Sequence, residues 1–115
     1  MNKRKVGRTF SRKRDVRKAF LRSLARALAL HGRIATTDAR ARELRPIAER
    51  LVTHAKKRTL ASRRFLIEQV GASVASAFID MVHKKYNDRR GGYTRIVKRI
   101  SRKSDGARRA IIEFV

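Results

Sequence analysis

Residues 33–57 read RIATTDARARELRPIAERLVTHAKK, a short extended segment followed at once by a helical one. Thr36 or Thr37 can cap the helix, because a threonine hydroxyl accepts a hydrogen bond from a free N–H of the first turn, and Asp38 suits the positive end of the helix dipole. Apolar residues then recur at helical spacing, at Leu44, Ile47, Ala48, Leu51 and Ala55. This spacing continues through Pro46, so we expect a bent helix rather than a divided one. The stretch therefore predicts a strand that leads into an amphipathic helix.

The sequence before this stretch predicts another helix. An apolar residue recurs every four positions, at Val16, Phe20, Leu24 and Leu28. This spacing is typical of one packed face of a helix over about residues 15–30. Gly32 can end the helix, since glycine adopts the left-handed conformation readily.

The sequence after it predicts two further helices and two strands. Thr59 is the expected cap of a helix whose apolar residues are Leu60, Phe65, Leu66 and Val70. Beyond Gly71, a fourth helix has its apolar residues at Val74, Ala75, Phe78, Met81 and Val82. Strands are predicted over about 93–100 and 108–115, joined by a turn at 104–106. In the last strand, alternation directs Ala110, Ile112 and Phe114 to one face, and Ile111, Glu113 and Val115 to the other.

The predicted order is helix, strand, three helices, two strands. Such an order is typical of an α+β fold in which a small sheet packs on helices. A chain of 115 residues is long enough for one core and too short for two. We therefore expect a single domain over residues 15–115, preceded by a basic N-terminal arm over residues 1–14.

The charge of the chain is strongly unbalanced. It has 32 Lys and Arg residues against 9 Asp and Glu residues, which gives a formal net charge of +23. A compact body with this charge repels itself, so we expect a polyanion to be its normal environment. Nucleic acid fits best, because its phosphates present dense negative charge and binding releases their counterions.

The arm is the most basic segment. Its cations precede the first acid, Asp15, and are Lys3, Arg4, Lys5, Arg8, Arg12, Lys13 and Arg14. Only Val6 and Phe10 are apolar anchors, so the arm cannot fold alone. We expect it to become ordered between RNA strands, where these side chains neutralise phosphates. The alternative is a disordered tail that only increases solubility.

Two further groups of residues are candidate RNA contacts. The first is a stripe opposite the apolar face of the first helix, made by Arg14, Lys18, Arg22 and Arg26. Because helix faces exposed to solvent usually mix acids with bases, this acid-poor stripe favours phosphate binding. The second is a glycine-bearing segment, made by Arg89, Arg90, Gly91, Gly92, Tyr93 and Arg95. Bare glycine backbone admits a phosphate strand and arginines can hold it, whereas Tyr93 either stacks on RNA or belongs to the core.

Other kinds of site find no support in the sequence. The three histidines (His31, His54 and His83) are far apart and there is no cysteine, so we expect no metal site. No nucleophile elbow, carboxylate pair or nucleotide-binding loop is present, so we expect no enzyme activity, no cofactor and no small-molecule substrate. Most of the few acids are predicted to form ion pairs, namely Asp15, Glu43, Glu49, Asp80 and Glu113.

Two other kinds of basic protein remain as alternatives. A nucleoid protein would be expected to have a dimer interface or a helix-turn-helix, neither of which the sequence predicts, and it would prefer duplex DNA to structured RNA. A membrane-active protein would need a broad apolar helix face, and the stripe on the first helix is narrow. Liposome flotation would separate that alternative from ours.

Four elements, in order, resemble the family of bacterial-type large-subunit ribosomal protein seventeen. They are RKVGR at 4–8; IATT, RARELR and ERLVTHAK within 34–56; RRGGYTRI at 89–96; and DGARRAIIE at 105–113. The resemblance implies a structural component of the large ribosomal subunit that binds its ribosomal RNA near the nascent-chain exit side. It also implies neighbouring large-subunit ribosomal proteins as partners and a cytoplasmic, ribosome-bound location without a membrane.

Overall fold

The described residues of the computed structural model, 13–99, 106 and 108–115, form four helices and three strands. In chain order these are α1 (Arg14–His31), β1 (Arg33–Thr37), α2 (Asp38–Lys57), α3 (Leu60–Val70), α4 (Ala72–Lys85), β2 (Thr94–Arg99) and β3 (Arg109–Phe114). This order confirms the predicted α+β fold.

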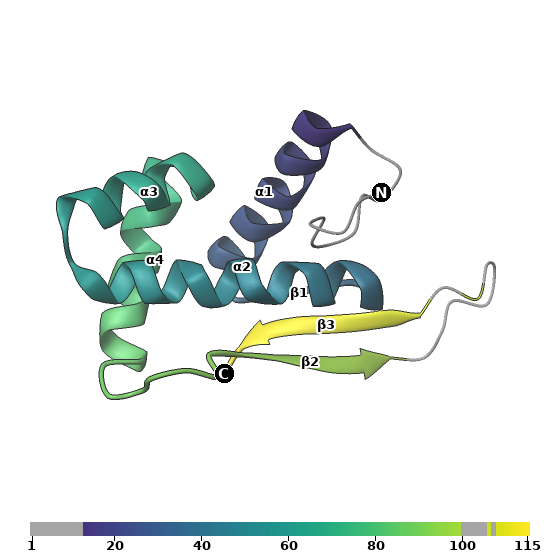
Figure 1. The fold of residues 1–115 in the computed structure, drawn as a ribbon. Coiled ribbons are helices and arrows are strands. Elements are labelled where there is room, and N and C mark those ends of the chain that lie inside the picture. Colours follow the sequence, from purple (N-terminus) through teal and green to yellow (C-terminus); the bar gives the residue numbers. More distant parts are fainter. Residues whose placement is uncertain (1–12, 100–105, 107) are drawn as a thin grey trace, which may run out of the picture.

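The three strands form an antiparallel sheet in the order β1-β3-β2, so the last strand lies in the middle. Helix α2 runs along one face of the sheet, and the other helices lie on the same side (Figure 1). The predicted alternation in β3 is confirmed on this inner face, where Ala110, Ile112 and Phe114 are buried in the core. The opposite, outer face of the sheet has no described helix over it.

Helix α2 is the centre of the core. Its buried apolar residues are Ala41, Leu44, Ala48, Leu51, Val52 and Ala55. They pack with Leu28 of α1, Leu66 of α3 and Phe78 of α4. Helix α2 contacts every other helix and strand. It also follows β1 directly, so the residue at which α2 begins sets the position of the sheet against the helices. The helix continues through Pro46 without a break, as the apolar spacing predicts.

The predicted helix ends are confirmed by their hydrogen bonds. Of the two candidate caps of α2, Thr37 is the one used, and its hydroxyl accepts a hydrogen bond from the Arg40 N–H at 3.3 Å. Thr59 caps α3 in the same way, accepting from the Ser62 N–H at 3.1 Å. Gly32 ends α1 with φ of 80°, and its N–H donates to the Leu28 carbonyl at 2.7 Å.

Two apolar residues do not pack as predicted. Val16 is 50% exposed and Leu60 is 64% exposed. Val16 lies in the first turn of α1, the end of that helix that projects away from the other elements (Figure 1). Leu60 is the first residue of α3, before that helix reaches the core. Periodicity assigns a residue to a face, but the face is covered only where a neighbouring element reaches it.

The last two strands are shorter than predicted, and part of the region between them lies outside the described residues. Tyr93 precedes β2 instead of belonging to it. Of the predicted turn at 104–106, the structure describes Gly106, whose φ of 68° is the left-handed value that a turn glycine supplies.

Candidate nucleic-acid interface

The predicted stripe lies on the exposed side of α1. Lys18 and Arg26 are exposed, as are Lys13, just before the helix, and Arg14, its first residue. Arg22 instead approaches the Glu68 carboxylate of α3, with 3.4 Å between Nη2 and Oε1. The stripe residues other than Arg14 line a hollow of about 520 Å³ between α1 and the end of α3.

The stripe has more acid beside it than the sequence of α1 predicts. Asp15 and Glu68 both line the hollow, and Glu68 is 46 residues from its partner Arg22. This pair is exposed on both sides, so solvent screens it and it contributes little to stability. On the other side of the stripe, Lys18, Arg22 and Arg50 of α2 line a second hollow of about 310 Å³. Arg50 was not predicted, because only the packing of α2 against α1 brings it there.

The glycine-bearing loop is held in place by two side chains of α2. The two carboxylate oxygens of Glu49 accept hydrogen bonds from the Tyr93 N–H, each at 3.1 Å, and Oε1 also accepts from the Thr94 N–H at 3.3 Å. The Lys56 ammonium donates to the Arg89 carbonyl and, at 3.1 Å, to the Tyr93 hydroxyl. Glu49 was predicted to form an ion pair. It binds backbone N–H groups instead, because the start of β2 lies against α2.

Tyr93 belongs to the core. It is 4% exposed, and its ring packs edge-on against Tyr86 with 5.2 Å between the ring centroids. Its hydroxyl donates to the Arg89 carbonyl at 2.9 Å. Burial raises the pKa of the Tyr86 hydroxyl, which donates to the Val115 carbonyl at 2.6 Å. Of the two alternatives for Tyr93, stacking on RNA is therefore wrong, since its ring is covered.

The arginines of the loop differ in freedom. Arg89 folds back on its own loop, where its Nε donates to the Gly91 carbonyl at 3.1 Å. Gly92 has φ of 64°, a value that favours glycine, whereas the space around Gly91 is open. Arg90 is exposed and makes no ion pair within the described residues. The loop therefore presents Arg90 and bare glycine backbone to a ligand, while Arg89 shapes the loop.

Arg95 lies apart from the loop, on the outer face of the sheet. Its Nε donates to Glu113 Oε1 at 2.6 Å, and Arg33 approaches the other carboxylate oxygen at 3.9 Å. The hydrogen bond from Arg95 lowers the pKa of the Glu113 carboxyl, and the charge of Arg33 acts in the same direction. The ion pair predicted for Glu113 is thus confirmed.

The structure separates the predicted contacts into three surfaces. Helix α1, which carries the stripe, and the loop lie on opposite sides of α2 in Figure 1. Arg95 lies on the outer face of the sheet. The predicted arm contacts Lys3, Arg4, Lys5, Arg8 and Arg12 lie outside the described residues. No helix in the described part of the chain is long and apolar enough to cross a membrane. Among the same residues, no group of His, Asp or Glu side chains is arranged to hold a metal ion.

Comparisons with known proteins find relatives that match most of the chain. The family model described as ribosomal protein L17 matches residues 20–115. The large ribosomal subunit protein bL17 of Fusobacterium nucleatum is 45% identical over 119 residues, which cover 100% of each chain. The protein of the same name from Acholeplasma laidlawii is 43% identical over 108 residues, covering 88% of this chain and 91% of the relative.

Proposed function

Because the chain belongs to the ribosomal protein L17 family, we propose that it binds and stabilises large-subunit ribosomal RNA through its separate basic surfaces. Members of this family are structural constituents of the large ribosomal subunit and not enzymes. The proposal adds a mechanism to that role, in which the folded body is enclosed by RNA and the arm over residues 1–14 lies between RNA helices.

The distribution of cations supports this mechanism. Helix α1 and the loop lie on opposite sides of α2, and the outer face of the sheet is the face turned away from the helices. Each of the three surfaces has arginines in excess of acids. A single nucleic-acid strand or a flat membrane contacts one such surface at a time. A folded RNA, with phosphates on several sides, neutralises all of them together and removes the self-repulsion of a chain of net charge +23.

The salt dependence of binding tests the role of the stripe. The probe is large-subunit ribosomal RNA, transcribed and folded with Mg²⁺, and the variant is Arg26→Gln. Arg26 makes no ion pair among the described residues, so its loss should reduce the slope of log K against log salt by about 0.9, the value for one phosphate contact. The matched control is Arg42→Gln, because Asp38 already balances Arg42 at 3.2 Å. The control should leave the slope close to that of the unaltered chain.

Competition in the same assay tests the class of ligand. Unlabelled ribosomal RNA should displace the probe, and duplex DNA of equal phosphate content should not. Equal competition by duplex DNA would overturn the proposal, since a protein that reads only phosphate density has no preference for folded RNA.

The arm is tested by deleting residues 1–12, which leaves Lys13 and all of α1 in place. We expect large subunits with the truncated chain to release it at lower salt than subunits with the complete chain. Unchanged incorporation and salt resistance would contradict a role for the arm in RNA binding.

The location near the nascent-chain exit side and the cytoplasmic setting are part of the same proposal and rest on the family resemblance. A stalled nascent chain with a photo-crosslinker at successive positions offers a test of the location. Crosslinks to this protein, or to RNA next to its footprint, are expected from positions close to the exit. Crosslinks confined to the opposite side of the subunit would contradict it.

A further inference from the structure

The outer face of the sheet is built from three cross-strand rows of side chains. The register places Glu113 between Arg33 and Arg95 in the first row. The second row is apolar, with Ile111 between Ala35 and Val97. The third row places Arg109 between Thr37 and Arg99. Side chains directly opposite each other on one face are close enough to interact, so each row acts as a unit.

The first and third rows differ in charge balance. In the first row the Glu113 carboxylate binds the arginines on both sides of it, at 2.6 Å and 3.9 Å. In the third row Arg99 and Arg109 are direct partners, and neither makes an ion pair within the described part of the chain. Like charges directly opposite each other destabilise a sheet. Among the described residues, nothing balances this pair of cations, and an external anion would stabilise it.

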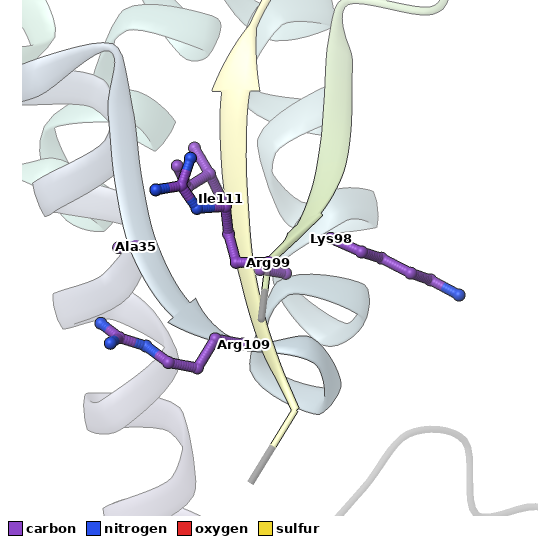
Figure 2. Close-up of a pocket in the computed structure, with 6 residues that line it drawn as sticks. Ala35, Lys98, Arg99, Arg109 and Ile111 are labelled. Carbon is purple, nitrogen blue, oxygen red and sulfur yellow. The ribbon is translucent and has the colours of Figure 1, made fainter. Parts of the chain in front are cut away.

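The apolar row lies beside this pair and is exposed at its two ends, Ala35 and Val97. Val97 is 42% exposed, whereas Ile111 is only 9% exposed. Figure 2 shows why Ile111 is less exposed, since the Arg99 side chain crosses β3 beside it. In the same view Arg109 extends toward β1, and Lys98 points the other way. The two arginines and Ile111 line a hollow of about 510 Å³. A ligand that enters it meets two guanidinium groups beside the side chains of Ala35 and Ile111.

We propose that the outer face of the sheet binds the sugar–phosphate backbone of a ribosomal RNA strand, with phosphates on Arg99 and Arg109 and riboses against Ala35 and Val97. This inference rests on the proposed function and deepens it at one of its three surfaces, because it names the part of the RNA that the outer face binds and the side chains that bind it. The planar guanidinium group can hold two oxygens of a phosphate at once, so a pair of arginines suits an RNA backbone. The carbon edge of a ribose suits a row that has no aromatic side chain to stack on a base.

The charges on this face favour RNA over a protein partner. Four arginines and one glutamate belong to the three rows, and that glutamate is already occupied by two of the arginines. The apolar row is one residue wide on each strand, which is narrow for the buried centre of a protein interface. A neighbouring ribosomal protein is the alternative occupant, and the experiment below distinguishes it.

Site-specific crosslinking tests the occupant in assembled large subunits. Val97 is replaced by p-benzoylphenylalanine, and Ser23, which lines the hollow beside the α1 stripe, is replaced in a second variant as the reference for the proposed function. We expect both positions to crosslink to ribosomal RNA. Crosslinks of position 97 to a protein, or to nothing, while position 23 crosslinks to RNA, would overturn this inference and leave the proposed function standing. Failure of position 23 as well would count against both.

Charge removal on the same face tests the role of the two arginines. In the Val97 crosslinking chain, the double change Arg99→Gln with Arg109→Gln should abolish the RNA crosslink. The change Arg42→Gln, at an arginine of α2 that does not line this hollow, should preserve it. The crosslink from position 23 should persist in both. Equal losses in the double variant and in Arg42→Gln would overturn the assignment of phosphates to Arg99 and Arg109.

The free protein provides a check on folding. Because Arg99 and Arg109 repel each other, the double variant should have a Tm equal to or above that of the unaltered chain in the absence of RNA. A lower Tm would mean that the two arginines support the sheet itself, and would contradict their assignment as a ligand site.

Discussion

At the scale of single residues, Glu49 shows how an acid in a very basic chain serves the fold. Its carboxylate binds two successive backbone N–H groups and, at 3.2 Å, the Thr94 hydroxyl, at the point where β2 begins. An acid that satisfies N–H groups of this kind fixes the backbone of the adjoining loop. The cations of the loop can then be presented in one conformation.

Replacing Glu49 should therefore destabilise the protein. Glu49→Ala leaves the Tyr93 and Thr94 N–H groups without their acceptor, so we expect the free energy of unfolding to fall by about 1–3 kcal/mol. The control is Glu68→Ala, which removes the same charge from an exposed pair with Arg22 and should cost less than about 0.5 kcal/mol. Urea unfolding measures both. Equal losses would mean that the effect comes from net charge and not from the hydrogen bonds.

Glu113 predicts a pH dependence on the outer face of the sheet. The Arg95 hydrogen bond holds the pKa of this carboxyl below its ordinary value of 4.5 in the folded protein. At a pH between the folded pKa and 4.5, the Glu113 carboxyl binds more protons in the unfolded chain than in the folded one. The stability that the ion pair contributes is therefore complete above pH 4.5 and is lost as the pH falls through the folded pKa. Urea unfolding at successive pH values measures this loss of stability. Arg95→Gln should make the loss smaller, and Arg26→Gln should leave it unchanged. Parallel curves for both variants would contradict the assignment.

At the scale of helices and strands, the sequence predicted most of what the structure contains. Helices α1 to α4 and strands β1 to β3 follow from apolar spacing, threonine caps and glycine stops, which act between residues close in the chain. The position of β3 between β1 and β2 does not, because no local pattern encodes which strands pair. For the same reason the contact between Arg22 and Glu68, the position of Arg50 beside the stripe and the burial of Tyr93 required the structure.

The caps give the clearest test at this scale. Thr59→Ala removes the hydroxyl that accepts from the Ser62 N–H and should lower the free energy of unfolding by about 1 kcal/mol. Thr53→Ala is the matched control, because Thr53 lies exposed within α2 and its hydroxyl only donates back to the Glu49 carbonyl. The control should be neutral or slightly stabilising, since alanine favours a helix interior. Equal destabilisation by the two changes would show that Thr59 contributes nothing as a cap.

At the scale of the whole molecule, the cations surround the body instead of forming one patch. Helix α1 lies on one side of α2, and the loop before β2 and the sheet lie on the other (Figure 1). Exposed arginines belong to α1, to the loop and to the outer face of the sheet. The body has a small core and a net charge of +23 over 115 residues. Such a molecule is most stable where anions meet it from several directions.

The most direct test of this account is where the protein is found in cells. Extract is sedimented through sucrose at low and at high salt, and the protein is quantified in the large-subunit fraction and in the supernatant. The account predicts that nearly all of the protein accompanies large subunits and remains with them at high salt, because many phosphate contacts must break together for release. A stable pool of free protein that does not associate with large subunits would contradict it.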